Sequence, residues 1–166
     1  MKKTIFTLLT GVTLLASCAQ SDEYVIYGTV SNPDLEGAQV FLVPIENPVK
    51  ENIDSVYIHN QTFEFRGTDE KMADIRIERF KRLGNETLLV VTEPGETYVT
   101  IGQISSGRGT PQNDSLQVWK NLTMQYRMKQ IDRDHYLNRT RAMIKGLGEK
   151  STLGAFLLSR MPKSAE

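Results

Sequence analysis

Apolar and polar residues alternate with a period of two along several short segments in the first two-thirds of the chain. Phe63 and Phe65 share one face of such a segment, whereas Glu64 and Arg66 share the other. This alternation is typical of a β-strand with one face against a core and one in water. Segments of this kind, rich in β-branched and aromatic residues, predict strands at 24–30, 38–45, 53–58, 62–66, 73–80, 87–92 and 97–102.

The spacing of these segments favours an antiparallel β-sandwich or open barrel over a parallel sheet, because the strands are short and turn-forming residues separate them. The turn at His59-Asn60 predicts a local hairpin over 56–63. Two continuously apolar stretches, 41–43 and 88–91, predict strands that are central in a sheet or covered on both faces.

Beyond the strands the apolar period changes to about 3.6, which is typical of helices. Thr110 and Pro111 suit the N-cap and first position of a helix, and the spacing predicts helices over 111–135, 137–145 and 151–160. The fold class is therefore mainly β, with about seven strands followed by a C-terminal helical segment, α+β overall. We expect the apolar stripe to pack on its own domain; a groove for a partner is the alternative.

The N-terminal residues have the pattern of a secretory signal. Lys2 and Lys3 precede an uncharged, apolar stretch over 5–16, as in the n- and h-regions of a signal peptide. A membrane-spanning helix needs about 20 apolar residues, so this stretch is too short to remain as an anchor by itself. We expect the segment to be cleaved off.

The single cysteine of the chain follows this stretch directly. Leu15, Ala16, Ser17 and Cys18 resemble a bacterial lipobox, in which the first three residues are recognised by the signal peptidase and the cysteine thiol receives diacylglycerol before cleavage. Two or three acyl chains would give lasting membrane attachment, because each buried CH2 contributes about 0.8 kcal/mol. The alternative is an ordinary signal peptide with a chance cysteine near its end.

These features divide the chain into a signal peptide at 1–17, an acylated tether at 18–23, a β-sandwich at 24–104 and a helical extension at 105–166. The implied location is the cell envelope, with a lipid anchor in the outer membrane. The short polar and acidic tract at 20–23 resembles a surface-export signal, and both the periplasmic face and the cell surface stay open as sites.

Composition excludes several classes of function. Lys and Arg together number 20, as do Asp and Glu, so the formal net charge is zero and no basic excess recruits nucleic acid. With Cys18 acylated, the mature chain has neither a free thiol nor a disulfide, which excludes thiol redox chemistry and a cysteine nucleophile. At 39% hydrophobic residues the chain can bury the core of one domain.

Few residues suggest catalysis, a metal or a cofactor. The segment 102–109 comes close to a phosphate-binding loop, but Arg108 and Gly109 stand where such a loop has lysine and a hydroxyl residue, and we interpret it as a strand-to-helix linker. Asp132 to His135 occupy successive helical positions, which point in different directions and cannot converge on one metal. We expect no catalytic residue, metal ligand or cofactor, with a hydrolase that uses two acidic residues as the alternative.

Two kinds of surface residue are candidates for contact with carbohydrate. Four tyrosines of the predicted strands are candidates for a sugar-stacking platform: Tyr24, Tyr27, Tyr57 and Tyr98. Ordinary strand composition explains these rings as well. Ser55 and Ser115 each follow an aspartate and precede an apolar residue, a pattern that resembles the O-glycosylation sequence of some bacterial envelope proteins. Chance is the alternative, and at Ser115 so is the preference of a first helical turn for acidic residues.

Several motifs, in their order, resemble one family. They are the strands at 24–30 and 38–42, the segments 53–56 and 63–67, Glu93-Pro94-Gly95, and Gly109-Thr110-Pro111-Gln112-Asn113-Asp114 at a helix start. Over residues 23–125 the chain is similar to the domain of unknown function 4369, a β-rich module at the N-terminus of Bacteroidetes envelope lipoproteins, commonly ahead of a thioredoxin-like domain of the peroxiredoxin or ResA type. The chain has no W-C-x-x-C motif, so the redox activity that the resemblance implies cannot be carried over to any residue here.

Three functions are compatible with the sequence. The first is a lipid-anchored binding or scaffolding module without catalytic activity, which contacts another envelope protein such as a separately encoded thioredoxin-fold partner. The second is a surface lipoprotein that captures glycan or peptide, and the third is an unrecognised hydrolase. A remnant of a longer oxidoreductase falls under the first, which is the one we expect.

Overall fold

The computed structural model of the chain describes residues 22–77 and 87–162, in which eight strands precede three helices. The strands are β1 (Tyr24–Val30), β2 (Gln39–Pro44), β3 (Asp54–Tyr57), β4 (Thr62–Gly67), β5 (Met72–Ile77), β6 (Thr87–Val91), β7 (Gly95–Ile101) and β8 (Ser106–Arg108). The helices are α1 (Pro111–Arg127), α2 (Arg133–Leu147) and α3 (Thr152–Ser159). The predicted signal peptide, the first part of the tether and the last three residues of the predicted strand 73–80 lie outside the described residues.

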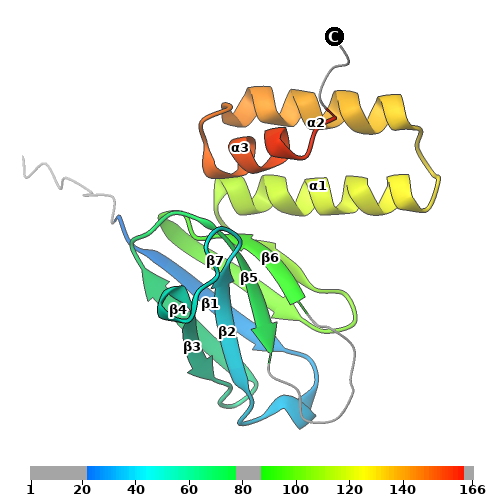
Figure 1. Ribbon diagram of the computed structural model, residues 1–166. Helices are drawn as coiled ribbons and strands as arrows, with labels where there is room; N and C mark the ends of the chain where they lie inside the picture. Colours follow the sequence, from blue (N-terminus) through cyan, green and yellow to red (C-terminus); the bar gives the residue numbers. More distant parts are fainter. Residues whose placement is uncertain (1–21, 78–86, 163–166) are drawn as a thin grey trace, which may run out of the picture.

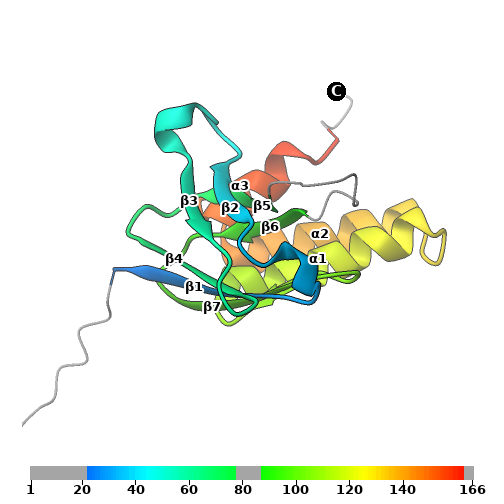
Figure 2. The ribbon, with the colours of Figure 1, turned by 90° about the horizontal axis from the view of Figure 1, so that it is seen from below.

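The strands form two four-stranded sheets that face each other as a sandwich and do not close into a barrel (Figure 1). The order is β4-β1-β7-β8 in one sheet and β3-β2-β5-β6 in the other. Neighbouring strands are antiparallel except β1 and β7, which are parallel. Seen from below, the two sheets appear as layers one above the other, and α1 and α2 extend past them to one side (Figure 2). The predicted mainly β sandwich with C-terminal helices is confirmed, whereas β8 and the parallel pair are not part of that prediction.

The core between the two sheets follows the predicted alternation. Phe63 and Phe65 of β4 are buried in it, whereas Glu64 and Arg66 are exposed. Gly28 of β1 lies directly opposite Phe63, and a Cβ atom there would come within 2.1 Å of the Phe63 ring. Only glycine therefore allows β1 and β4 to close over this ring.

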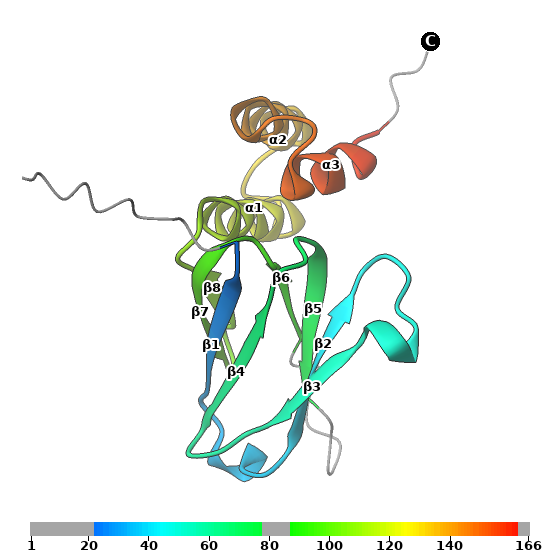
Figure 3. The same ribbon diagram turned by 90° about the vertical axis from the view of Figure 1, so that its left-hand side faces the viewer.

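The helices form a layer over one end of the sandwich, with α1 nearest to the strands and α2 farthest from them (Figures 1 and 3). Leu88 and Val90 of β6 belong to the core between the sheets, whereas Leu89 and Val91 belong to a second apolar cluster with helical residues such as Leu116. Because both faces of β6 are covered, its continuously apolar sequence is explained as predicted. Within the described ranges, every helix is too short or too polar to cross a membrane.

The predicted hairpin over 56–63 is wrong in its pairing. Its turn exists, because Asn60 and Gln61 have positive φ angles of 53° and 58°. The strands on either side then separate, since β3 pairs with β2 in one sheet and β4 with β1 in the other. Ile58 between β3 and the turn is fully buried, and its N–H bonds the carbonyl of Ala38 beside β2. The chain crosses from sheet to sheet at this point because Ile58 belongs to the core.

The first helix ends earlier than predicted. α1 ends at Arg127 and α2 begins at Arg133, whereas the apolar spacing predicted one helix as far as His135. Lys129 has a positive φ of 58°, which interrupts the helix. Asp132 starts the next one, because its carboxylate accepts the N–H of His135 at 2.7 Å. The apolar spacing continues through this turn, so periodicity alone misses the break.

The segment interpreted as a strand-to-helix linker, 102–109, is largely a hairpin. The chain turns after β7 and returns as β8, which pairs antiparallel with β7 so that Gly107 lies opposite Val99. A three-residue strand of Ser, Gly and Arg has no apolar alternation, and this is why the pattern did not predict it.

Candidate functional site

The motif at 109–114 forms the centre of a buried polar network beneath the N-terminus of α1. Asn113 is only 2% exposed. Its side-chain amide accepts the N–H of Val91 at 2.9 Å and donates to the carbonyl of Val91 at 2.8 Å. It also donates to the hydroxyls of Thr97 at 3.1 Å and Thr110 at 2.8 Å. Because Val91 and Thr97 lie in different sheets, this one side chain joins both sheets to α1.

Glu93 caps the same helix from the loop between β6 and β7. Its Oε1 accepts the N–H of Gln112 at 2.7 Å and that of Asn113 at 3.1 Å, which are backbone donors that a helix start leaves unpaired. The negative charge is also favoured at this end by the helix dipole. Thr110 and Pro111 occupy the N-cap and the first turn as predicted, but the Thr110 hydroxyl makes no capping bond. The capping acceptor is Glu93 instead.

Gln112 extends the network to α3. Its Nε2 donates at 2.7 Å to Glu70, which also accepts from the hydroxyl of Thr152 at 2.7 Å. Its Oε1 accepts the N–H of Leu153 at 2.8 Å. We call the buried members of this network the polar junction: Glu93, Thr97, Thr110, Gln112 and Asn113.

The hydrogen bonds of the polar junction hold α1 against the two sheets. Among the described residues, the indole N–H of Trp119 is the one buried side-chain polar group without a partner, so the junction itself is fully hydrogen-bonded. Such networks fix one arrangement of the elements they join. No three His, Cys, Asp or Glu side chains within residues 22–77 and 87–162 are grouped to hold a metal ion.

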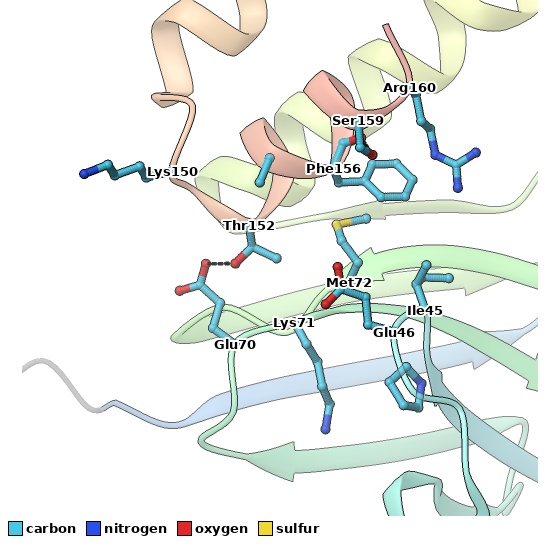
Figure 4. A pocket seen from close by; sticks show the side chains of 12 residues that line it. Ile45, Glu46, Glu70, Lys71, Met72, Lys150, Thr152, Phe156, Ser159 and Arg160 are labelled. Atoms are coloured by element: carbon cyan, nitrogen blue, oxygen red, sulfur yellow. Dashed lines mark hydrogen bonds between the residues drawn. The ribbon is translucent and has the colours of Figure 1, made fainter.

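An open groove of about 450 Å³ lies beside α3, along the ends of β2 and β5 (Figure 4). Met72 and Phe156 supply apolar walls, and the guanidinium of Arg160 lies 4.4 Å from the centre of the Phe156 ring. Glu46 and Glu70 both line the groove. Glu70 already accepts two hydrogen bonds, one of which is drawn in Figure 4. It therefore serves as a structural acceptor that ties α3 to the strands.

The structure brings together two of the four candidate tyrosines. Tyr27 of β1 and Tyr98 of β7 lie opposite each other in the parallel pair and stack, with ring centres 5.4 Å apart and ring planes at 25°. Tyr24 is in the core, where burial raises the pKa of its phenol to about 12. Tyr57 lies in β3, on the other sheet. A platform of all four tyrosines is therefore wrong, and a face with two remains.

Tyr27 and Tyr98 belong to a row across the exposed face of the sheet β4-β1-β7-β8. Glu64 lies beside Tyr27 on β4, and Arg108 lies beside Tyr98 on β8. The Tyr98 side chain is well exposed, and its hydroxyl donates to the carboxylate of Glu96 at 2.5 Å. This hydrogen bond raises the pKa of Tyr98. We call the four residues Glu64, Tyr27, Tyr98 and Arg108 the tyrosine row.

Lys120 of α1 lies against β6. Its Nζ donates to the carbonyl of Leu89 at 2.6 Å. Burial lowers the pKa of this ammonium group to about 8, while the nearby carboxylate of Asp74 acts in the opposite direction. A lysine in this state loses its proton at a pH well below that of a lysine in water.

Both predicted glycosylation sites lie in the part of the chain that the structure describes, whereas the predicted lipid anchor does not. Four predicted residues lie outside the part of the chain that it describes: Leu15, Ala16, Ser17 and Cys18. Ser55 is exposed on β3, an edge strand, and accepts a hydrogen bond from Gln39 at 2.9 Å. Ser115 is half-buried in the first turns of α1. Ser55 is the more accessible of the two predicted glycosylation sites.

Sequence reasoning missed the polar junction and Lys120, although both leave a signal. Gln112 and Asn113 follow the proline that starts α1, and the start of a helix that must pack on strands needs acceptors for its free N–H groups. Lys120 lies four residues after the buried Leu116. It is therefore on the apolar face of the helix, where an unpaired charge is unusual.

Comparison with known proteins identifies one family. The family model described as a domain of unknown function (DUF4369) matches residues 24–116, which is more than half of the chain. No curated protein and no solved structure matches. The matched range runs from β1 through the polar junction into α1, so it contains both the sandwich and the network that fastens α1 to it.

Proposed function

The chain belongs to the family of the domain of unknown function DUF4369, and on that premise we propose that it is a lipid-anchored binding and scaffolding module of the cell envelope. Acyl chains on Cys18 hold it in the outer membrane, facing the periplasm or the cell surface. The module has no catalytic activity of its own and positions another envelope protein. We propose a separately encoded protein of the thioredoxin fold, because the chain resembles modules that commonly precede such a domain.

The observation that carries this proposal is the tyrosine row. Tyrosine and arginine are enriched at the centres of protein interfaces, where a few such side chains supply most of the binding energy. Tyr27 and Tyr98 are already stacked on each other, so binding costs little side-chain entropy. Arg108 at one end of the row offers donor groups to a partner, and Glu64 at the other end, which is paired with Arg66, can accept a further hydrogen bond.

The stacking of the two rings favours a protein partner over a sugar. A sugar ring binds an aromatic side chain by covering a free ring face with C–H groups. Tyr27 and Tyr98 turn one face toward each other at 5.4 Å, and the backbone of Gly109 approaches the Tyr98 ring closely enough that a Cβ there would lie 3.2 Å from it. The ring edges and hydroxyls are better placed for binding, and these suit contacts with a protein surface.

A second candidate is the capture of a glycan or peptide on the same face. The exposed carboxylates of Glu64 and Glu96 and the guanidinium of Arg108 are groups that hydrogen-bond sugar hydroxyls or the polar groups of a peptide. This candidate uses the same residues, so one set of variants separates the two.

The test is affinity purification of the acylated protein from cross-linked whole cells, read out by mass spectrometry. Tyr98→Ala combined with Arg108→Ala removes one half of the row, and we expect it to abolish recovery of the partner. Tyr57→Ala is the matched control, because it removes a tyrosine of similar exposure, 57% against 55%, from the other sheet. We expect the control to recover the partner as the unchanged protein does.

Three outcomes bear on the proposal. Recovery of a thioredoxin-fold or other envelope protein that is lost only with the row variant supports it. Equal recovery with the row variant and Tyr57→Ala contradicts it. Binding of envelope oligosaccharide in an affinity gel, lost only with the row variant, favours the second candidate. Loss of fatty-acid labelling in Cys18→Ala tests the anchor separately.

A further inference from the structure

The neutral overall charge hides a separation between the two layers of the molecule. Residues 22–110 contain eight Lys and Arg against fifteen Asp and Glu, whereas residues 111–162 contain nine against four. The sandwich is therefore acidic and the helical layer is basic. A molecule with this distribution is drawn to an anionic surface by its basic side and repelled by its acidic side.

The exposed side of α2 carries much of the basic charge. Three of its four exposed cations lie away from its buried side and form what we call the outer basic face: Arg139, Arg141 and Lys145. The fourth, Arg133 in the first turn, is in register with the buried residues and is not part of this face. Thr140 and Ile144 are buried in the layer, and α2 is the helix farthest from the strands (Figure 3). The exposed side of α2 is therefore directed away from the sandwich. Both ion pairs found within the described residues lie on β4 and β5. The cations of α2 are thus available to an external anion, and Asp134 is the one acidic residue in the helix.

The helical layer covers the end of the sandwich at which the described chain begins. The carbonyl of Glu23, just before β1, accepts the N–H of Gly95 at 3.0 Å, and Glu93 two residues earlier caps α1. Figure 1 shows the start of β1 at the same end of the sandwich as the helices but to one side of them, and Figure 3 shows it below α1. Cys18 precedes Asp22 by four residues, which span about 14 Å at most. A membrane that holds acyl chains on Cys18 therefore lies close to this end of the molecule.

We propose that the outer basic face of α2 rests on the anionic phosphate groups of the membrane in which the acyl chains of Cys18 are inserted. The orientation rests on the proposed anchoring at Cys18, whereas the affinity of the face for anionic lipid does not. The short tether keeps the face near the headgroups, so even weak contacts are formed at a high effective concentration. The acidic sandwich then points away from the membrane, and the tyrosine row on its exposed sheet face remains accessible to a partner.

The first test measures binding of the unanchored chain to lipid vesicles. The chain from residue 18 onward, carrying Cys18→Ala, is sedimented with vesicles of phosphatidylcholine alone or with about 30% phosphatidylglycerol. Each basic residue near an anionic surface strengthens binding several-fold. We expect binding to the anionic vesicles only, and its loss in about 0.5 M salt because the charges are screened.

Charge reversal locates the binding face. Arg141→Glu with Lys145→Glu is expected to lower the partition coefficient at least about tenfold. Lys50→Glu with Arg76→Glu makes the same change in net charge on the sandwich, at exposed positions outside the tyrosine row, and is expected to alter the partition coefficient by less than about twofold. Equal binding to both kinds of vesicle, or an equal loss in the two variants, would overturn the proposal.

The second test measures orientation in the acylated protein. A fluorophore on Asn138→Cys in α2, or on Gln103→Cys at the other end of the sandwich, is paired with an acceptor dye in the vesicle surface; acylation occupies Cys18, so the label is unique. We expect stronger energy transfer from position 138, reduced by the Arg141→Glu and Lys145→Glu pair. Equal transfer from both positions would refute the orientation. Partner capture through the tyrosine row does not depend on these lysines and arginines, so failure here and failure of the proposed function are distinguishable.

Discussion

The two buried regions of this molecule are built in different ways. The core between the sheets consists of apolar side chains such as Ile26, Leu42 and Ile75, which are fully buried. The attachment of the helices depends in addition on the polar junction, centred on Asn113. Apolar burial has no preferred direction, whereas a buried polar group is stable only with its own partners in place. The core therefore tolerates exchanges between apolar residues of similar size, whereas the attachment depends on the identity of single residues.

Among substitutions in the attachment of the helices, Asn113→Ala is expected to lower stability the most. The substitution leaves the N–H and carbonyl of Val91 and the hydroxyls of Thr97 and Thr110 without their bonds to this side chain. We expect the free energy of unfolding to fall by about 3 kcal/mol. Urea unfolding measures the loss, and amide hydrogen exchange shows where it falls, which we expect to be α1, α2 and α3.

Ile75→Ala is the matched control in the core. It leaves a cavity in a site that is fully buried and is expected to cost about 2–5 kcal/mol. Its effect should reduce exchange protection in the strands as much as in the helices. Equal loss of exchange protection in strands and helices after Asn113→Ala would show that the polar junction does not stabilise the attachment of the helices independently of the core.

The second prediction concerns the charge buried at the edge of the attachment. The pKa of Lys120 is lowered to about 8 by burial, below that of a lysine in the unfolded chain. The unfolded chain therefore binds more protons between about pH 8 and 10, and stability is expected to rise with pH through this window. Above about pH 10 the raised pKa of Tyr24, about 12, works in the opposite direction.

Lys120→Met tests this charge directly. The variant is expected to be more stable than the original protein at pH 7 by on the order of 1–3 kcal/mol, because no charge is buried on folding. Its unfolding free energy should also be flatter between pH 8 and 10 than that of the original. A variant with lower stability at pH 7 would mean that the bond from Lys120 to the Leu89 carbonyl outweighs the cost of burial.

The third prediction compares a buried and an exposed glutamate that accept hydrogen bonds from the backbone in the same way. Glu93 in the buried junction and Glu36 on the surface each accept two consecutive backbone N–H groups, those of residues 112–113 and 60–61. Glu93→Gln is expected to cost about 1–2 kcal/mol at pH 7, because a charge-assisted bond is replaced by neutral ones in a buried site. Glu36→Gln should lower the melting temperature only slightly. Similar losses in the two variants would show that burial does not govern the strength of this arrangement.

The pH dependence of the surface carboxylate gives the smallest effect. The N–H groups of Gln61 and Asn60 hold the pKa of Glu36 below its usual value of 4.5. Its stabilising contribution is therefore complete above that value and is lost as the pH falls through the lower, folded pKa. The difference in melting temperature between Glu36→Gln and the original protein should vanish in strong acid; a difference that persists there would have another cause.

The strands were predictable where one residue in two is apolar. Phe63 and Phe65 show which face of β4 is directed into the core, and the continuous apolar sequence of β6 indicates that both of its faces are covered. These features can be identified from the sequence because each buried position requires an apolar residue, whatever its neighbours are. The mainly β sandwich, the position of the helices and the family were accordingly within reach of the sequence.

The partners of the polar residues were not predictable in the same way. Asn113 meets Val91 and Thr97 only once two sheets and a helix are assembled, and no local spacing encodes that meeting. The divergence of β3 and β4 into different sheets has the same origin, since the burial of Ile58 depends on the whole core. Directional interactions between distant segments need the fold before they can be identified.

The parallel pairing of β1 with β7 sets the order in which this chain can fold. Tyr24 must find Gly95, and Val30 must find Ile101, so a long loop is closed before the pairing yields any stabilisation. Until β7 pairs with it, β1 lacks one of its two neighbours, and its open edge can pair with other chains throughout that interval. The first strand of the sequence is thus among the last to gain both its neighbours, and the sheet does not assemble in the order of its strands along the chain.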